Sequence, residues 1–385
     1  MGYYSDYLKK QWDFDQLSLE RKKQLKKISG LRENRDIIVY GSDFTKNAPT
    51  SIDYNDILPF QDQLSNLKSN AIDIILETPG GFAEVVEDLV KLIRGKYEKV
   101  GIIIPGSAKS AGTIFAMAGD EILMGASSSL GPIDAQIQTN NKKYSAEAFL
   151  EGLEKIKTEV LNSGKLNPAY IPILQNISPG EIQHCENAQD FSKQLVTQWL
   201  SEYKFKFWTV HSSTQQPVTE NDKRNRAHQI AEKLCRQSEW LTHARSIKID
   251  DFEKMQLKIT DFSKTPDLNE AIMRYYTLLK MSFESNIYKV FETIDSQIYR
   301  FFIPPQLNPQ IKKRNEIAGV NFECPKCHQH FLIQVNLGSS QPMKPGHLPY
   351  PVDNDIFECP NCQLKSNIGQ IRLQLEAQFG KKIVK

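Results

Sequence analysis

The sequence lacks several features that would by themselves fix a location or a class of partner. No apolar run approaches the ~18 residues that a membrane-crossing helix needs. The first residues, MGYYSDYLKKQWDFDQ, hold neither the apolar stretch nor the small-residue cleavage site of a signal peptide. Charge of one sign is not in excess, because 48 basic and 46 acidic side chains leave a net charge of +2. Composition therefore gives no attraction to nucleic acid or anionic membranes, and we expect a cytoplasmic protein with no membrane span.

Cysteine is scarce as well, with six in 385 residues. Two of them, Cys185 and Cys235, stand alone in helical contexts, where a cysteine usually acts as a small buried hydrophobe. The other four form two C-x-x-C pairs, which are Cys324 with Cys327 and Cys359 with Cys362. In a reducing compartment such pairs favour metal over disulfide, and four thiolates close the coordination shell of zinc. We predict a small zinc ribbon with a structural, not catalytic, Zn²⁺.

Apolar runs alternate with helical patterns through the first third of the chain. Strands are expected at Ile37–Gly41, Ile72–Leu76, Val100–Ile104 and Glu121–Met124, and helices at Ala83–Arg94 and Ala111–Ala118. Strands and helices that alternate at this spacing are typical of parallel sheets with right-handed crossovers. The pattern predicts an α/β core.

Two turns in this core suit acyl-transfer chemistry. The stretch Val100–Gly112, VGIIIPGSAKSAG, places Ser110 between a buried strand and a helix, where backbone N–H groups lack partners. The stretch Ala71–Gly81, AIDIILETPGG, ends its strand in a pair of glycines that let the backbone approach a ligand. Ser110 in this position also suits a helix N-cap. The nearby glycine turn favours a nucleophile beside an oxyanion hole.

Further along, apolar residues recur at steps of three or four between residues 267 and 302. This spacing predicts one long helix of ~50 Å, at 1.5 Å per residue. Such a helix would form an oligomer interface or lie across its own core. We accordingly expect an N-terminal helical arm (1–30), a core domain (31–265), a long helix with linker (266–312) and the zinc ribbon (318–385).

Four motifs resemble one protein family. They are ETPGG at 77–81, KSAGT at 109–113, AMAGDEILM at 116–124 and LGPIDAQ at 130–136, with weaker similarity at LTHARSI and at SNIYKVFET (285–293). The family is that of the serine dehydrogenase proteinases, in the superfamily of Clp protease, signal peptide peptidase A and crotonase. The resemblance implies a Clp/crotonase-type spiral of ββα units, serine peptidase activity on peptides or proteins, and a homo-oligomer.

The resemblance also implies roles for individual residues. It places the nucleophile on Ser110 and the oxyanion donors on the backbone N–H groups of Gly81 (or Gly80) and Ala111. The zinc ribbon lies outside the resemblance.

The general base is open between two arrangements. In the Clp branch a histidine occupies the place that Asp134 fills here, so this sequence departs from that pattern. In the signal peptide peptidase branch the base is a lysine, and Lys143, before a downstream helix, fits that place, with Lys142 and Lys109 as alternatives. A lysine base must be neutral, which requires burial to lower its pKa from ~10.4 toward 7. In the second arrangement His184 is the base and Asp134 orients it.

Three functions remain in competition. The first is a cytoplasmic serine peptidase whose zinc ribbon docks substrate or a partner protein. The second is an inactive scaffold of the same fold, whose ribbon binds protein or nucleic acid; basic and aromatic residues around the ribbon are sparse. The third is crotonase-like acyl-CoA chemistry, which uses the oxyanion turn but not Ser110.

Overall fold

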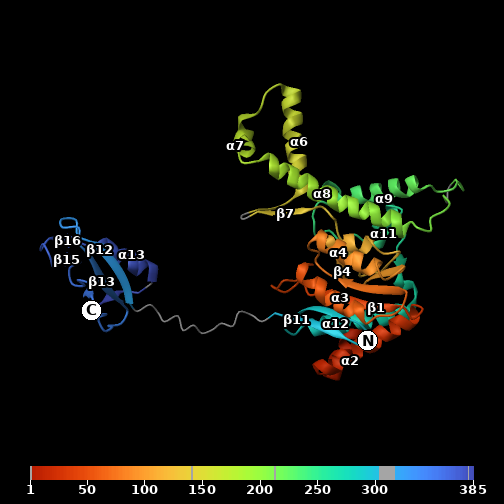
Figure 1. The fold of residues 1–385 in the computed structure, drawn as a ribbon, viewed down its shortest axis with the longest axis horizontal. Helices are drawn as coiled ribbons and strands as arrows, with labels where there is room; N and C mark the ends of the chain where they lie inside the picture. Colours follow the sequence, from red (N-terminus) through yellow and green to blue (C-terminus); the bar gives the residue numbers. More distant parts are fainter. Residues whose placement is uncertain (1, 140–141, 212–213, 303–316, 380) are drawn as a thin grey trace. The chain divides into compact units, whose positions relative to one another are not determined.

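The structure is a computed structural model, and it describes residues 2–139, 142–211, 214–302, 317–379 and 381–385. Contacts within the chain divide it into two compact units, Met1–Phe302 and Ile303–Lys385. The units are described separately below (Figure 1).

The first unit is built on a seven-stranded sheet with the order β11-β10-β1-β2-β3-β5-β9. Five of these strands run parallel, namely β1 (Asp36–Ser42), β2 (Ala71–Glu77), β3 (Lys99–Ile104), β5 (Glu121–Met124) and β9 (Thr260–Asp261). Every residue of β2 is buried, as expected for a central parallel strand covered on both faces. The parallel α/β core predicted from the alternating pattern is confirmed.

Helices cover both faces of this sheet (Figure 1). Alternate strand residues point to opposite faces, so Ile38 and Tyr40 join one apolar cluster while Ile37 and Val39 join the other. The first cluster packs under α3 (Ile57–Ser65), α4 (Ala83–Arg94), α5 (Ala111–Met117), α8 (Pro179–Trp199), α9 (Glu220–Cys235) and α11 (Ile249–Lys254). The second packs against α2 (Phe14–Leu31) and α12 (Pro266–Phe283).

A second, smaller layer of strand pairing follows the carboxyl ends of the main strands. Here β4 (Ser107–Ala108) pairs with β6 (Ser129–Leu130), and single bridges join Ile52 to Gly81 and Thr78 to Ala108. The strands β2 and β3 thus each continue into short second-layer pairing before their helices α4 and α5. This is the predicted spiral of ββα units, and it brings the glycine turn and the serine turn side by side.

The predicted long helix at 266–302 is wrong. The helix α12 ends at Phe283, and the chain continues as an antiparallel hairpin of β10 (Ile287–Glu292) and β11 (Gln297–Phe301). The apolar residues Val290 and Phe291 are buried because β10 pairs with the edge strand β1. Pairing with an exposed sheet edge therefore overrides the helical spacing of the sequence.

The N-terminal segment is also not a peripheral arm. The helix α2 follows α1 (Tyr3–Lys10), and its residues Leu25 and Ile28 are fully buried against the sheet. Arg21 is buried too, where it forms an ion pair with Glu292 at 3.0 Å. These residues belong to the same unit as the core domain.

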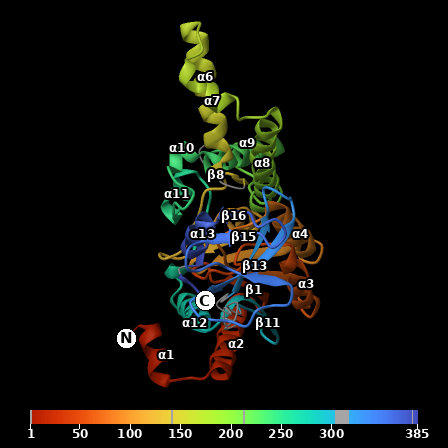
Figure 2. The same ribbon diagram turned by 90° about the vertical axis from the view of Figure 1, so that its left-hand side faces the viewer.

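Several further elements complete the first unit. After the hairpin of β7 (Gln136–Thr139) and β8 (Lys142–Ser145), the helices α6 (Ala146–Ser163) and α7 (Ile171–Leu174) stand away from the sheet in both views (Figures 1 and 2). The shorter elements are η1 (Tyr54–Asp56), η2 (Pro168–Tyr170), η3 (Leu200–Lys204), α10 (Gln237–Trp240) and η4 (Phe262–Lys264).

The second unit is a small β-rich body with one helix. It contains β12 (Ile317–Glu323), β13 (His330–Leu337), β14 (His347–Pro349), β15 (Ile356–Glu358), β16 (Lys365–Asn367), α13 (Gly369–Phe379) and β17 (Ile383–Val384). Its own apolar cluster includes Ile333, Val335 and Phe357. Across both units, no helix among the described residues has the length and apolarity needed to span a membrane.

Candidate active site and metal centre

Ser110 adopts a backbone conformation that non-glycine residues avoid. Its φ is 51° and its ψ is −120°, at the position that starts α5. The side chain makes no capping hydrogen bond to the helix, so an N-cap role does not explain the serine. Its carbonyl oxygen, by contrast, accepts from the N–H groups of Thr113 and Ile114 at 2.8 and 3.2 Å. Strain of this kind gathers at functional sites, and here the hydroxyl-bearing residue is partly exposed.

The glycine turn lies directly against this serine. Gly80 has φ +100°, and a Cβ added to it would lie 2.6 Å from both the Cβ of Ser110 and the carbonyl oxygen of Lys109. Gly81 has φ +153°, and a Cβ there would lie 2.2 Å from the carbonyl oxygen of Ile52. Only glycine fits at either position. The two turns that the sequence placed at neighbouring strand ends are therefore in contact.

Two backbone donors remain free beside Ser110. The N–H of Gly80 donates to Thr78 Oγ1 at 3.2 Å. The N–H groups of Gly81 and Ala111 have no hydrogen-bond partner among the described residues. Unused donors on two adjoining turns are suited to hold the negative charge of a tetrahedral oxyanion.

A buried carboxylate and a histidine meet close to these turns. Asp134 is 1% exposed, and its Oδ1 lies 2.7 Å from Nδ1 of His243. Its Oδ2 accepts from Nε2 of Gln136 at 2.7 Å. A carboxylate at Nδ1 favours the tautomer with the proton on Nδ1, which leaves Nε2 able to accept a proton.

Hydrogen bonds tie the loop that carries His243 to the serine turn. Lys109 precedes Ser110, and its Nζ donates to the carbonyl oxygen of Arg245 at 3.3 Å and to Ser246 Oγ at 3.1 Å. The same Nζ donates to the carbonyl oxygen of Leu130 at 2.9 Å, ahead of Asp134. Burial lowers the pKa of Lys109 to about 8. Ser110, Asp134 and His243 are thus brought to one region through Lys109.

Of the predicted lysine bases, Lys143 lies in β8, where its backbone pairs with Gln138. The side chains of Lys143 and Lys142 lie outside the described part of the structure, so their proposed roles stay predictions. Lys109, the third alternative, uses its ammonium group to hold the 245–246 loop, as described above.

The predicted pair of Asp134 with His184 is not formed. His184 is exposed on α8, where it lines a surface depression with Glu84 and Phe191. Asp134 instead bonds His243, a residue that the sequence reasoning did not select. The signal was present, because His243 lies within LTHARSI, one of the weaker matches to the family pattern.

A second buried carboxyl group hydrogen-bonds to the segment that leads into the serine turn. Glu77, the last residue of β2, is 1% exposed and its Oε2 accepts from the N–H of Ser107 at 2.7 Å. Its Oε1 accepts from the hydroxyl of Tyr276, on α12, at 3.0 Å. Burial raises the pKa of Glu77 to about 7, although Lys280 lies 3.8 Å away. Glu77 therefore links α12 to the short strand that leads into Ser110.

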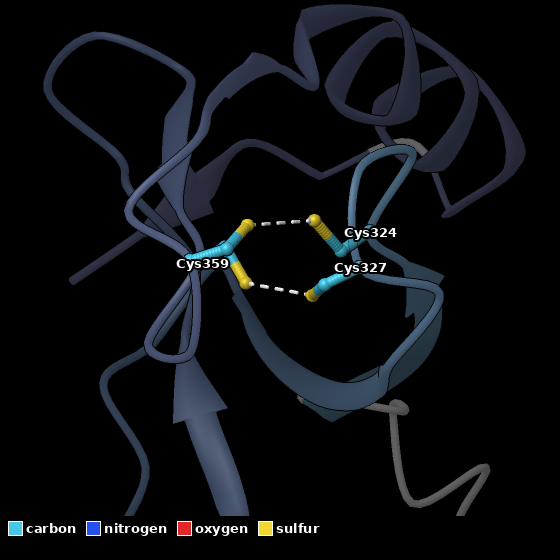
Figure 3. Close-up of side chains that lie close together, drawn as sticks. Cys324, Cys327 and Cys359 are labelled. Atoms are coloured by element: carbon cyan, nitrogen blue, oxygen red, sulfur yellow. Dashed lines mark hydrogen bonds between the residues drawn. The ribbon is translucent and has the colours of Figure 1, made fainter.

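The four paired cysteines converge in the second unit (Figure 3). Their sulfur atoms all lie within 4.8 Å of one another, with Sγ–Sγ distances of 3.6 Å for Cys324–Cys362 and Cys327–Cys359. A tetrahedral site with Zn–S bonds of about 2.3 Å separates its sulfurs by about 3.8 Å, so this donor set fits zinc. Each pair sits on a tight knuckle, in which the N–H of Cys324 donates to Gln329 and that of Cys359 to Leu364. A four-thiolate metal centre is therefore available.

The fold is that of a ClpP-like α/β domain in which a serine turn lies against a glycine turn. Residues 50–201, less than half of the chain, match the family described as ClpP-like SDH-type serine proteinase. The match contains Gly80, Gly81, Ser110, Ala111 and Asp134. It confirms the resemblance seen in the motifs, while His243 and the second unit lie beyond it.

Similar proteins cover smaller parts of the chain. The uncharacterised proteins MJ1495 and MJ0137 of Methanocaldococcus jannaschii are 37% identical over 90 residues and 32% identical over 88 residues. Each alignment covers 23% of this chain, and the chain spans only 31% and 29% of these relatives. Among solved structures, a mutant of the 1510-N membrane-bound stomatin-specific protease is 26% identical, with a TM-score of 0.22, over 30% of this chain and 60% of that one.

Proposed function

We propose that this chain is a serine peptidase in which Ser110 is the nucleophile and His243, oriented by Asp134, is the general base. The observation that carries the proposal is the 2.7 Å contact between Asp134 Oδ1 and His243 Nδ1, beside a strained and accessible serine. A serine hydroxyl needs a base to take its proton before it can attack a carbonyl carbon. A histidine oriented by a carboxylate is an arrangement that supplies such a base in serine hydrolases.

The reaction follows from these positions. His243 Nε2 accepts the proton of the Ser110 hydroxyl as Oγ attacks the peptide carbonyl, and the oxyanion receives hydrogen bonds from the N–H groups of Gly81 and Ala111. The imidazolium then gives its proton to the leaving amine, which departs and leaves an acyl-serine. Water, deprotonated by His243, hydrolyses the acyl-serine and returns the hydroxyl to Ser110. Asp134 orients the ring and stabilises the imidazolium.

The setting and assembly are part of the same proposal. A thiolate centre of Cys324, Cys327, Cys359 and Cys362 would hold a structural Zn²⁺ and favours a reducing compartment, which supports a cytoplasmic location. A homo-oligomer is supported by apolar side chains exposed on and around the α6–α7 segment, which are Leu161, Leu166, Ile171 and Ile173. The zinc-bearing unit is the candidate site for docking substrate or a partner protein.

The test is labelling with a fluorophosphonate probe together with hydrolysis of fluorescein-labelled casein. Wild-type protein is expected to form a covalent adduct that mass spectrometry locates on Ser110, and to release fluorescent peptides. Ser110→Ala should lose both, while circular dichroism shows an unchanged fold. A folded wild-type protein that forms no adduct and cleaves no casein would favour the inactive scaffold.

A further inference from the structure

A cavity of about 880 Å³ lies away from Ser110, near the amino end of β5. Its lining comes from four regions of the chain and comprises Asp120, Glu121, Lys204, Phe205, Phe207, Trp208, His211, Arg226, Gln256, Lys258 and Thr260. Ser110 follows the carboxyl end of β3, which runs parallel to its neighbour β5. The cavity and the serine turn therefore lie at opposite ends of these strands. The volume falls within the range of small-molecule sites.

The side chains that line this cavity carry more positive than negative charge. Its two carboxylates are already paired outward, Asp120 with Arg94 at 2.9 Å and Glu121 with Arg32 at 2.6 Å. Its three cations, which are Lys204, Arg226 and Lys258, form no ion pair within the described residues. The cavity therefore presents three cations and two carboxylates, an excess of positive charge, and none of the three cations is held in an ion pair within the described residues.

Lys204 is the cation most enclosed by the protein. Its Nζ donates to the carbonyl oxygen of Asp120 at 3.4 Å, which is long for a hydrogen bond and uses one of its three donors. Burial lowers the pKa of Lys204 to about 8, although the charges of Glu121 and Asp120 act in the opposite direction. Lys204 ends the π-helical turn η3, in which the N–H of Phe205 reaches back to the carbonyl oxygen of Leu200 at 2.8 Å. π-helical turns are found disproportionately at functional sites.

The residues that follow Lys204 in the sequence line one wall of the cavity with aromatic side chains. Trp208 and His211 meet edge to face, with ring centroids 5.1 Å apart and planes at 81°. Phe207 is 76% exposed although it is a large apolar residue. Aromatic side chains beside cations that lack an ion pair are a combination that proteins use to contact a planar ring while binding its attached anion.

We propose that this cavity binds a small anionic ligand that carries a planar ring, the chemistry of a nucleoside diphosphate. Lys204, Arg226 and Lys258 hold the phosphates, and Phe207 with Trp208 contacts the ring. An inorganic anion would use the cations but leave the aromatic wall exposed. The site is separate from Ser110, so the proposal does not depend on peptidase activity.

Isothermal titration calorimetry with ADP on the full chain tests this site. Wild-type protein and the Ser110→Ala variant are expected to bind ADP at one site with equal, sub-millimolar affinity. Lys204→Gln and Arg226→Gln should each weaken binding at least about tenfold, as the loss of a charge-assisted contact implies. Lys233→Gln is the matched control, because it removes an exposed lysine of α9 that does not line the cavity.

Titrations with pyrophosphate and with adenosine test whether binding needs both the phosphates and the ring of the ligand. Each is expected to bind at least about tenfold more weakly than ADP, because each supplies only half of the contacts. Three results would overturn the proposal. They are no heat of binding at millimolar ADP, equal affinity in the Lys204→Gln and Lys233→Gln variants, and pyrophosphate binding as tight as that of ADP.

Discussion

Asp134 and His243 are separated by 109 residues of chain, yet Oδ1 of the one lies 2.7 Å from Nδ1 of the other. The carboxylate is buried and the imidazole is 26% exposed. The buried carboxylate fixes the ring through Nδ1, so Nε2 is the nitrogen that the proposed mechanism assigns to take the proton of Ser110.

Replacing the carboxylate tests that assignment. Asp134→Asn is expected to lower kcat for casein hydrolysis by about 10²–10⁴-fold, because an amide can donate to Nδ1 and so stabilise the wrong tautomer. KM should change little, since Asp134 is buried away from substrate. Gln136→Ala, which removes the other hydrogen bond to this carboxylate, is the milder comparison. Equal kcat values for wild type and Asp134→Asn would contradict the role.

The glycine turn gives a steric prediction. Gly80→Ala would place a Cβ 2.6 Å from Ser110 Cβ at a positive φ, so the serine turn must shift. We expect fluorophosphonate labelling to slow by at least about 10²-fold and the free energy of unfolding to fall by about 2 kcal/mol. Gly152→Ala is the matched control, because a Cβ there meets nothing within 4 Å. Full labelling of Gly80→Ala would show that the turn is not part of the site.

Glu77 gives a pH dependence of stability. Burial raises its pKa from 4.5 to about 7, so between these values the folded protein keeps a proton that the unfolded chain releases. When the folded state binds more protons, the free energy of unfolding falls as pH rises through that window. Glu77→Gln cannot ionise, so its stability relative to wild type should rise by about 2–3 kcal/mol between pH 4.5 and 8.

The measurement is urea unfolding at a series of pH values. Glu253→Gln, which removes an exposed carboxyl, is the control and should follow the wild-type profile. Parallel profiles for wild type and Glu77→Gln would contradict the assignment of that titration to Glu77.

The cysteine cluster predicts a metal content and a separable effect on folding. Wild-type protein is expected to bind about one zinc ion per chain, and Cys324→Ser should lose it and destabilise the second unit. Labelling of Ser110 should persist, because the serine lies in the other compact unit. Cys185→Ala removes a cysteine from outside the cluster and should keep the metal. Zinc-free wild-type protein after purification with zinc would refute the site.

The sequence predicted those parts of the site that depend on local pattern. The serine and glycine turns follow from short apolar strands that end in small residues, and the four cysteines follow from their spacing. The base could not be found in this way. His243 reaches Asp134 through the chain between β7 and β9, and the weak LTHARSI match that contains His243 does not by itself indicate this contact.

Two of the predictions made for the fold were wrong for a similar reason. Apolar residues of 287–301 recur at helical steps, but Val290 and Phe291 are buried by pairing with β1. The sequence of α2 is rich in lysine and does not indicate that Arg21 is buried. Inside the protein, Arg21 forms an ion pair with Glu292. In both cases a partner distant in the sequence determined the structure.

The identity of the base is tested most directly by the rate at which a fluorophosphonate reacts with Ser110 at pH 7. The account predicts that His243→Ala slows this reaction by about 10³-fold or more, while His184→Ala and Lys143→Ala react at the wild-type rate. A wild-type rate in His243→Ala, with loss of reaction in Lys143→Ala, would contradict the account and assign the base to the lysine.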